Sequence, residues 1–155
     1  MLNIKNISVA IMLILSINNG KISIKEQFNT WQIEIPKINL NANISEGTTK
    51  DIMDAYVGHF SSTQTWTGNV GLAAHNRGYP VNYFQNIKDL KIGDKIIYKY
   101  RFAKKEYEIY SVGIISDEDW SFLKNTQENI ITLITCVENK PNLRRCIQGK
   151  EINKI

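Results

Sequence analysis

Three kinds of side chain that can act together in acyl transfer stand at the boundaries of apolar stretches in this sequence. Cys136 directly follows a β-branched run, and His75 directly follows a shorter apolar stretch. Arg144 and Arg145 begin the final apolar stretch. If these boundaries meet in the folded chain, a thiol, an imidazole and a guanidinium lie side by side.

These three groups have a well-defined joint chemistry. A free thiol has a pKa of about 8.5, and a neighbouring imidazolium or guanidinium favours its thiolate form. The thiolate attacks an acyl carbon, and the imidazolium protonates the leaving amine. The guanidinium stabilises the oxyanion or holds substrate carbonyl groups. No carboxylate is required as a third member, since Asn76 or a backbone carbonyl can orient the imidazole.

The same residues also have a purely structural interpretation. A cysteine on a β-branched run is most often a small buried hydrophobe, and a histidine at a strand end is often a surface or packing residue. By count, two cysteines and two histidines could form a Cys2His2 zinc site, but the sequence contains neither C-x2-C nor H-x3-H spacing. The sequence therefore predicts no metal and no cofactor. Spacing alone leaves the role of Cys136 open.

Alternating apolar and polar residues predict that these side chains sit on a mainly β domain. Pro36 interrupts the first alternating segment because it lacks a backbone donor. Strands are predicted at 31–35, 38–44, 69–74, 95–101, 105–115, 130–135 and 143–152. Short helices or turns are predicted after Thr48 or Thr49, near 81–87, and at 120–124 behind Asp117 or Asp119. Seven or eight short strands with two or three short helices predict a closed or nearly closed β-barrel, or a sandwich.

Composition sets the class of protein. The 155 residues suit one domain, and 43% hydrophobic with 22% charged residues allow a packed core. The formal net charge is +4, but the basic residues are scattered rather than gathered in a stripe. Nucleic-acid binding is therefore not expected.

The N-terminus has a separate character. Residues 7–17 form an apolar run after Lys5, which is shorter than the about 20 residues of a spanning helix. Residues 1–17 therefore resemble a signal or anchor segment, although no A-x-A-like cleavage site follows. An uncleaved signal-anchor is the favoured interpretation, ahead of an amphipathic or disordered leader and a cleaved signal. Residues 18–30 are predicted to be a linker, and 31–155 the catalytic domain.

Four motifs, in order, resemble the sortases, which are cysteine transpeptidases of Gram-positive cell surfaces. The sequence TLITC at 132–136 resembles the T-L-x-T-C signature, and GLAAHNR at 71–77 resembles the strand that ends in the catalytic histidine. The sequence RRCIQG at 144–149 resembles the final strand with the essential arginine, and IPKI at 35–38 resembles the start of the domain. The resemblance covers nearly all of residues 31–152. The segments HNRGYP at 75–80 and LITC at 133–136 are most similar to those of class D sortases.

The resemblance implies an eight-stranded sortase-type β-barrel with two or three short helices. It also implies that His75, Cys136 and one arginine lie at one end of a substrate groove. Sortase final strands commonly have the pattern R-x-x-x-x-(A/G), so Gly149 indicates Arg144. Adjacent strand residues face opposite sides, so Arg144 and Arg145 cannot both enter the site.

The implied reaction is cleavage of an LPxTx-type sorting signal after Thr, through a thioester acyl-enzyme. The protein is then transferred to an amine of a peptidoglycan precursor or of a pilin. The implied partners are LPxTx-bearing surface proteins or pilins, and the implied location is the extracellular face of the cell membrane with membrane anchoring. Two alternatives stay open: a sortase-fold cysteine protease that mainly hydrolyses, and a non-catalytic β-barrel binding module.

Several other residues receive provisional roles. Thr135 and Asn76 are candidate substrate-binding residues, although packing is the favoured role for Thr135. Cys146 is expected to be a core residue near the site, with a disulfide to Cys136 as the less favoured alternative. The acidic run 117–119 is expected to be solvated or to cap a helix rather than to bind calcium.

Overall fold

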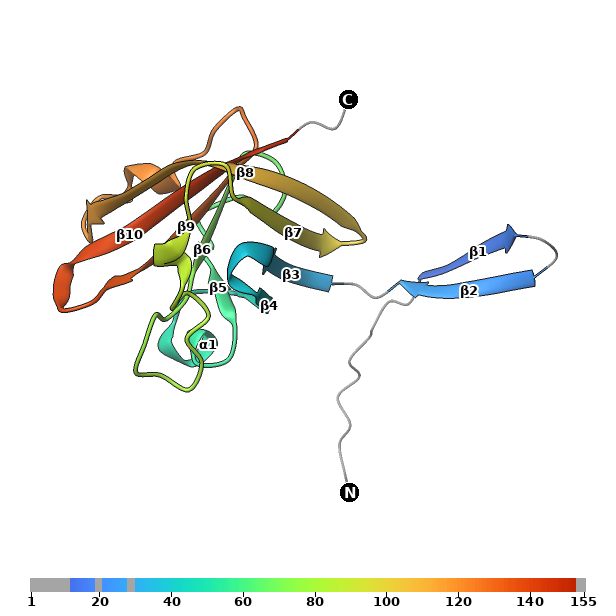
Figure 1. Ribbon diagram of the computed structural model, residues 1–155, viewed down its shortest axis with the longest axis horizontal. Coiled ribbons are helices and arrows are strands. Elements are labelled where there is room, and N and C mark those ends of the chain that lie inside the picture. Colours follow the sequence, from blue (N-terminus) through green and yellow to red (C-terminus); the bar gives the residue numbers. More distant parts are fainter. Residues whose placement is uncertain (1–11, 19–20, 28–29, 153–155) are drawn as a thin grey trace, which may run out of the picture.

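The computed structural model describes residues 12–18, 21–27 and 30–152. Eight strands form a closed barrel in the order β10-β8-β7-β3-β4-β5-β6-β9 (Figure 1). Neighbours are antiparallel except for the parallel pairs β4–β5 and β6–β9. The strands are β3 (Thr30–Ile35), β4 (Leu40–Glu46), β5 (Val57–His59), β6 (Asn69–Ala73), β7 (Lys95–Arg101), β8 (Ala103–Ser116), β9 (Ile130–Val137) and β10 (Lys140–Glu151).

The predicted fold class is confirmed, because the mainly β prediction and the eight-stranded barrel both match the structure. The strand that the sequence did not reveal is β5. It has three residues, Val57–His59, and all three are buried. A segment that short shows no alternation, so its strand character depends on pairing with β4 and β6.

Short helices connect the strands: η1 (Pro36–Ile38), α1 (Lys50–Met53), η2 (Ile87–Asp89) and η3 (Trp120–Leu123). Thr49 stands at the N-cap of α1 as predicted, but its side chain makes no capping hydrogen bond. Asp119 is the cap of η3, since its side chain accepts a hydrogen bond from the Ser121 backbone N–H at 3.0 Å. This cap orients the short helix over the outer surface of the barrel wall.

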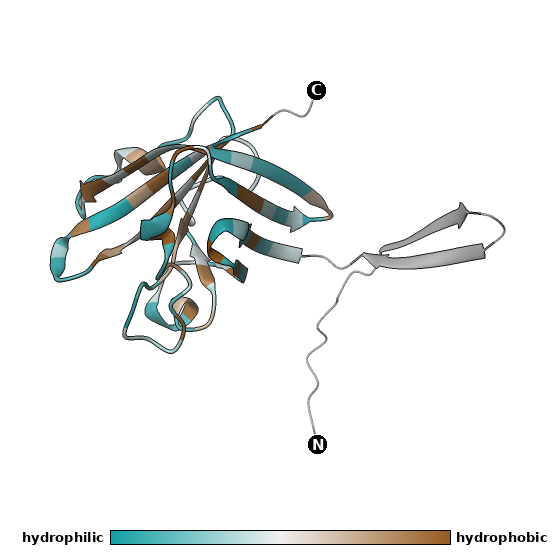
Figure 2. Ribbon diagram, viewed as in Figure 1, coloured by the Kyte–Doolittle hydropathy of each residue, from teal (hydrophilic) through white to brown (hydrophobic). Residues whose placement is uncertain are grey.

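The barrel interior is the main hydrophobic core. Teal and brown alternate along the barrel strands in Figure 2, as expected for walls with one apolar face. Ile131 and Leu133 of β9 and Ile147 of β10 belong to this core and are at most 1% exposed. Fully burying an aliphatic side chain of this size contributes about 1.5–3 kcal/mol. The core fixes which residues of β9 and β10 face inward.

The two ends of β9 and β10 depart from the sequence-based prediction. The ladder of β9 continues through Cys136 to Val137, so the thiol lies within the strand rather than after it. The predicted loop before residue 143 is replaced by a tight connection in which Asn139 has a φ of 57°. An asparagine tolerates this left-handed conformation better than most residues. The connection lets Lys140 pair with Val137, and after a register shift the β9–β10 ladder runs on from the pair of Arg144 and Cys136.

Residues before the barrel form a separate antiparallel pair, β1 (Met12–Asn18) and β2 (Lys21–Gln27). The predicted linker at 18–30 thus contains a strand where irregular structure was expected. Residues 1–11 of the predicted signal or anchor segment lie outside the described residues. Within the described ranges, no helix has the length and hydrophobicity needed to cross a membrane. The predicted domain boundaries stay predictions.

Candidate active site

Cys136 is an exposed free thiol on the outer face of the barrel wall. Its face follows from the alternation along β9, in which Ile131 and Leu133 belong to the barrel core and Ile134 to a second, outer cluster. Residues two apart share a face, so Cys136 faces outward with Ile134. The strand thus keeps the thiol out of the core.

Arg144 lies directly opposite Cys136 in the β9–β10 ladder, and Arg145 lies opposite Thr135. Directly opposed residues of an antiparallel pair share a face, so Arg144 is on the thiol face and Arg145 on the other. The Arg144 guanidinium donates to the Pro141 carbonyl at 2.6 Å. It also lies 3.7 Å from Asp117 Oδ2.

An apolar cluster adjoins the thiol on the outer face. We call it the outer cluster; its buried members are Leu123, Ile134 and Cys146, and Phe60, Ile115 and Phe122 pack against them. Burial and, to a lesser degree, the charge of Asp119 raise the pKa of the Cys146 thiol to about 12. Cys146 is therefore a neutral packing residue of this cluster, in line with the favoured prediction, and both cysteines are free.

A buried polar network fixes η3 against the barrel wall. Asn69, 1% exposed, donates from its side-chain amide to the carbonyls of Phe122 at 2.8 Å and Lys124 at 3.0 Å. Its Oδ1 accepts from the Thr132 hydroxyl at 2.8 Å. Gly71 allows this close packing, because a Cβ there would lie 2.8 Å from a methyl group of Leu123. The wall of the outer cluster is thus built by specific contacts.

His75 follows β6, and its backbone carbonyl accepts a hydrogen bond from the Phe84 N–H at 3.0 Å. Its side chain is 10% exposed, and Nε2 lies 3.2 Å from Asp54 Oδ1. The Tyr79 ring stacks on the imidazole, with centroids 3.6 Å apart and an interplanar angle of 7°. Among the described contacts, none joins this ring to the Cys136 thiol.

Asn76 and Thr135 join the ends of β6 and β9. The Asn76 side-chain amide donates to the Cys136 carbonyl at 2.8 Å, so it bridges to the nucleophile strand rather than orienting the imidazole. The Thr135 hydroxyl donates to the Ala74 carbonyl at 2.7 Å, and the residue is 5% exposed. These contacts agree with packing for Thr135; substrate binding by either residue stays a prediction.

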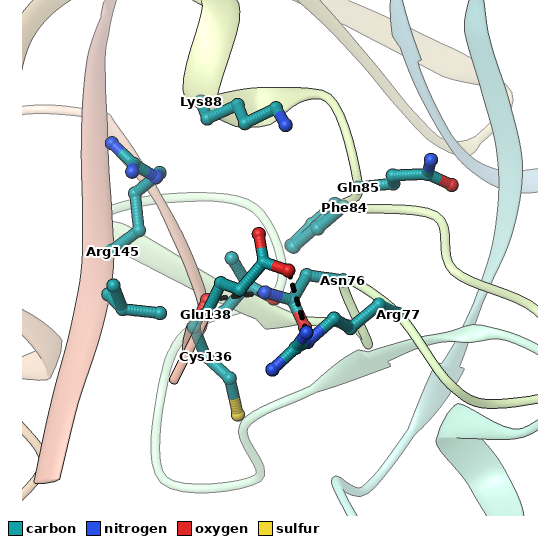
Figure 3. A pocket seen from close by; sticks show the side chains of 10 residues that line it. Asn76, Arg77, Phe84, Gln85, Lys88, Cys136, Glu138 and Arg145 are labelled. Carbon is teal, nitrogen blue, oxygen red and sulfur yellow. Dashed lines mark hydrogen bonds and ion pairs between the residues drawn. The ribbon is translucent and has the colours of Figure 1, made fainter. Parts of the chain in front are cut away.

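A cavity of about 350 Å³ lies beside the end of β9, and Cys136 is one of its lining residues. Its lining includes Lys88, Arg145 and Arg77, and Arg77 is paired with Glu138 at 2.6 Å. Figure 3 shows the Cys136 sulfur directed away from Arg145 and Lys88. Cys136 therefore borders this basic cavity, while its sulfur points away from these two cations.

Three site residues escaped the sequence analysis: Asp54 and Tyr79 beside His75, and Asp117 beside Arg144. Asp117 was considered only as part of an acidic run and as a helix cap. Asp54 is the C-cap of α1, and nothing in its local sequence relates it to His75. Contacts of this kind depend on the packing of α1 against the barrel, which the sequence pattern does not report.

Comparison with known proteins places the chain in the sortase family. The sequence model of the sortase domain family matches residues 33–151 of this chain. Sortase A of Bacillus anthracis is 29% identical over 122 residues, which are 78% of this chain and 58% of that protein. Sortase D of Bacillus subtilis (strain 168) is 31% identical over 129 residues, 77% of this chain and 62% of that protein. The chain thus spans about three fifths of the length of these relatives.

Solved structures give the same result. A Clostridium perfringens Sortase D5 transpeptidase matches with a TM-score of 0.72 and 30% identity, over 89% of this chain and 83% of that chain. A lid mutant of Sortase A from Corynebacterium diphtheriae matches with a TM-score of 0.75, over 81% of this chain and 71% of that chain. At 23% identity, the latter shows the fold alone. The two relatives named Sortase D fit the class D wording of the motifs.

Proposed function

The chain belongs to the sortase family, and from this premise we propose that it is a cysteine transpeptidase that cleaves an LPxTx-type sorting signal after Thr. Cys136 is the nucleophile, His75 the general acid and base, and Arg144 the cation that stabilises the oxyanion. The observation that carries the proposal is the pairing of an exposed thiol with Arg144 directly opposite it on one face of the wall.

The outer cluster supports a peptide substrate. It lies on the face shared by Cys136 and Arg144, and its partly buried members Phe60 and Phe122 offer apolar surface. The leucine and proline of a sorting signal have side chains that gain free energy from such a surface. The threonine carbonyl then lies toward Cys136, with Arg144 beside its oxygen.

The reaction has two balanced steps. The Cys136 thiolate attacks the threonine carbonyl carbon, the C–N bond breaks, and the His75 imidazolium protonates the leaving amine. An acceptor amine then attacks the thioester, the new amide bond forms, and the thiolate leaves. Neutral His75 takes the proton released by the attacking amine. The positive charge of Arg144 faces the oxyanion in both steps.

The proposed partners follow from the same reaction. The donor is a surface protein or pilin with an LPxTx signal near its C-terminus, and the acceptor is an amine of a peptidoglycan precursor or of a pilin lysine. The proposed location is the outer face of the cell membrane, with the segment at 1–17 as the anchor. The family to which the chain belongs supports these assignments.

Intact-protein mass spectrometry tests the proposal directly. The full chain is incubated with LPxTG and LPxTA peptides, with and without a small primary amine, beside Cys136→Ala. We expect a thioester adduct on the unmodified protein alone, and its release as an amide when the amine is present. Release only as the free acid would indicate a hydrolase. The absence of any adduct, with a thiol no more reactive than free cysteine, would indicate a binding module.

A further inference from the structure

The side chain of Asp54 sits at the edge of the His75 imidazole. Asp54 is the C-cap of α1, directly after Met53, and its Oδ1 lies 3.2 Å from His75 Nε2. Both atoms are buried, and neither makes a hydrogen bond within the described part of the chain, so the 3.2 Å contact joins two otherwise unsatisfied polar atoms. Burying a polar atom without a partner costs free energy. We therefore take the carboxylate oxygen and the imidazole nitrogen as partners of each other.

Two further side chains hold this arrangement in place. Lys50 pairs with Asp54 from the preceding turn of α1. The Lys50 ammonium also lies 5.5 Å from the centroid of the Tyr79 ring, and that ring stacks on the imidazole. The carboxylate therefore holds the edge of the imidazole, and the phenol covers its face.

Asp54 is charged in this setting. A hydrogen bond from Lys50 lowers its pKa most, the charge of His75 lowers it further, and burial opposes these effects without cancelling them. A charged carboxylate can only accept a hydrogen bond. The imidazole nitrogen that faces it therefore carries the proton.

We propose that Asp54 is a positioning residue for His75: its carboxylate accepts a hydrogen bond from Nε2–H and so leaves Nδ1 to exchange the proton with the Cys136 thiol and the leaving amine. The hydrogen bond on one ring nitrogen decides which tautomer is present. The negative charge also stabilises the imidazolium that protonates the leaving group. This inference rests on the proposed transpeptidase function, and it adds a residue that the motifs do not include.

Steady-state kinetics on the full chain test the positioning role, with a sorting-signal peptide that acylates the unmodified enzyme. Asp54→Ala removes the acceptor, and Asp54→Asn keeps the shape and one acceptor oxygen but removes the charge. Asp51→Asn is the matched control, because Asp51 is an exposed carboxylate on the same helical turn. We expect Asp54→Ala to lower kcat at least about 10-fold with KM within about 2-fold. The loss in Asp54→Asn should be smaller, and Asp51→Asn should behave like the unmodified enzyme.

A spectroscopic measurement separates positioning from a general structural role. In ¹⁵N-histidine-labelled protein at alkaline pH, neutral His75 should carry its proton on Nε2, and His75→Gln identifies its signals beside those of His59. In Asp54→Ala we expect both tautomers to be populated, with a melting temperature close to that of Asp51→Asn. An unchanged tautomer in Asp54→Ala, or a kcat within about 2-fold of the control, would overturn the proposal. If the unmodified protein turns over no peptide, the proposed function fails, while the tautomer comparison still decides the role of Asp54.

Discussion

Arg144 lies directly opposite Cys136 in the antiparallel ladder between β9 and β10. Such opposed residues have Cβ atoms about 4.5–5.5 Å apart and side chains on one face. The guanidinium is held at present by the Pro141 carbonyl and lies near Asp117. A long side chain can exchange these partly exposed contacts for a substrate carbonyl. The strand pairing therefore fixes the position of the Arg144 backbone beside Cys136, and the contacts with Pro141 and Asp117 fix the guanidinium when no substrate is bound.

The ladder predicts different outcomes for the two neighbouring arginines. Arg144→Ala should lower kcat/KM for a sorting-signal peptide about 100-fold or more, because it removes the cation beside the oxyanion. Arg145→Ala should stay within about 3-fold, since Arg145 opposes Thr135 on the other face. Peptide cleavage rates for the two purified variants check this. A larger loss in Arg145→Ala than in Arg144→Ala would assign the oxyanion-stabilising role to Arg145.

The Asn76 side chain should matter for both stability and turnover. Asn76→Ala removes the hydrogen bond to the Cys136 carbonyl, at a cost of about 0.5–1.5 kcal/mol in the free energy of unfolding. It also loosens the link between the histidine loop and the nucleophile strand, so we expect kcat to fall about 10-fold. Urea unfolding and steady-state rates measure the two effects. Gln85→Ala, an exposed change in the same loop, is the control; equal effects in both variants would contradict the bridging role.

The two cysteines should differ sharply in reactivity. Cys136 is exposed, whereas Cys146 is 4% exposed and burial helps to raise the pKa of its thiol to about 12. The thiolate is the reactive form, so iodoacetamide at pH 8 should modify one thiol in the folded protein and two in urea. Mass spectrometry counts the adducts. Modification of the folded Cys136→Ala variant would show that Cys146 is accessible. If neither cysteine is modified until a reductant is added, the two cysteines form a disulfide.

Gly71 should be intolerant of a side chain. A Cβ at this position would lie 2.8 Å from a Leu123 methyl carbon and 2.9 Å from the Thr63 methyl carbon. Gly71→Ala should therefore destabilise the fold by about 1–3 kcal/mol and raise KM, because η3 and the outer cluster are displaced. Gly113→Ala is the matched control, since nothing lies within 4 Å of a Cβ there. Equal unfolding midpoints for the two variants would contradict the packing argument.

Acid should weaken the barrel through Glu46. Burial raises the pKa of Glu46, but hydrogen bonds from Ser61 and His59 outweigh it, so the net pKa lies below the ordinary 4.5. A carboxyl group whose pKa is lower in the folded state stabilises the fold above pH 4.5, and this contribution is lost as the pH falls through the lowered value. The unfolding midpoint should therefore drop as the pH falls below 4.5.

The corresponding variant isolates the contribution of this carboxylate. Glu46→Gln should be less stable than the unmodified protein at pH 7, and the difference should shrink toward pH 3. Glu138→Gln, which changes an exposed carboxylate, should show a smaller difference at pH 7. Urea titrations at several pH values make the comparison. A stability difference for Glu46→Gln that stays constant with pH would rule out this linkage.

Local sequence patterns were sufficient for the fold class and for the candidate nucleophile and base. Alternating segments become strands because one face of each must be buried, and the continuous apolar or β-branched runs at 69–74 and 130–135 become strands that are buried on both faces. These two local patterns predicted seven of the eight barrel strands. Cys136 and His75 were found because each follows an apolar strand segment in a motif that the sortases share. These signals depend on residues close together in the chain, so they are visible without the structure.

The remaining features depend on which strands pair and in what register. The β9–β10 register puts Arg144, and not Arg145, on the thiol face, and a shift of one residue would reverse that result. The contact between Asp54 and His75 arises from the packing of α1 against the loop after β6. The three residues of β5 form a strand because they pair with β4 and β6. Sequence therefore determined which chemical groups are available, whereas long-range pairing and packing decided which of them face one another.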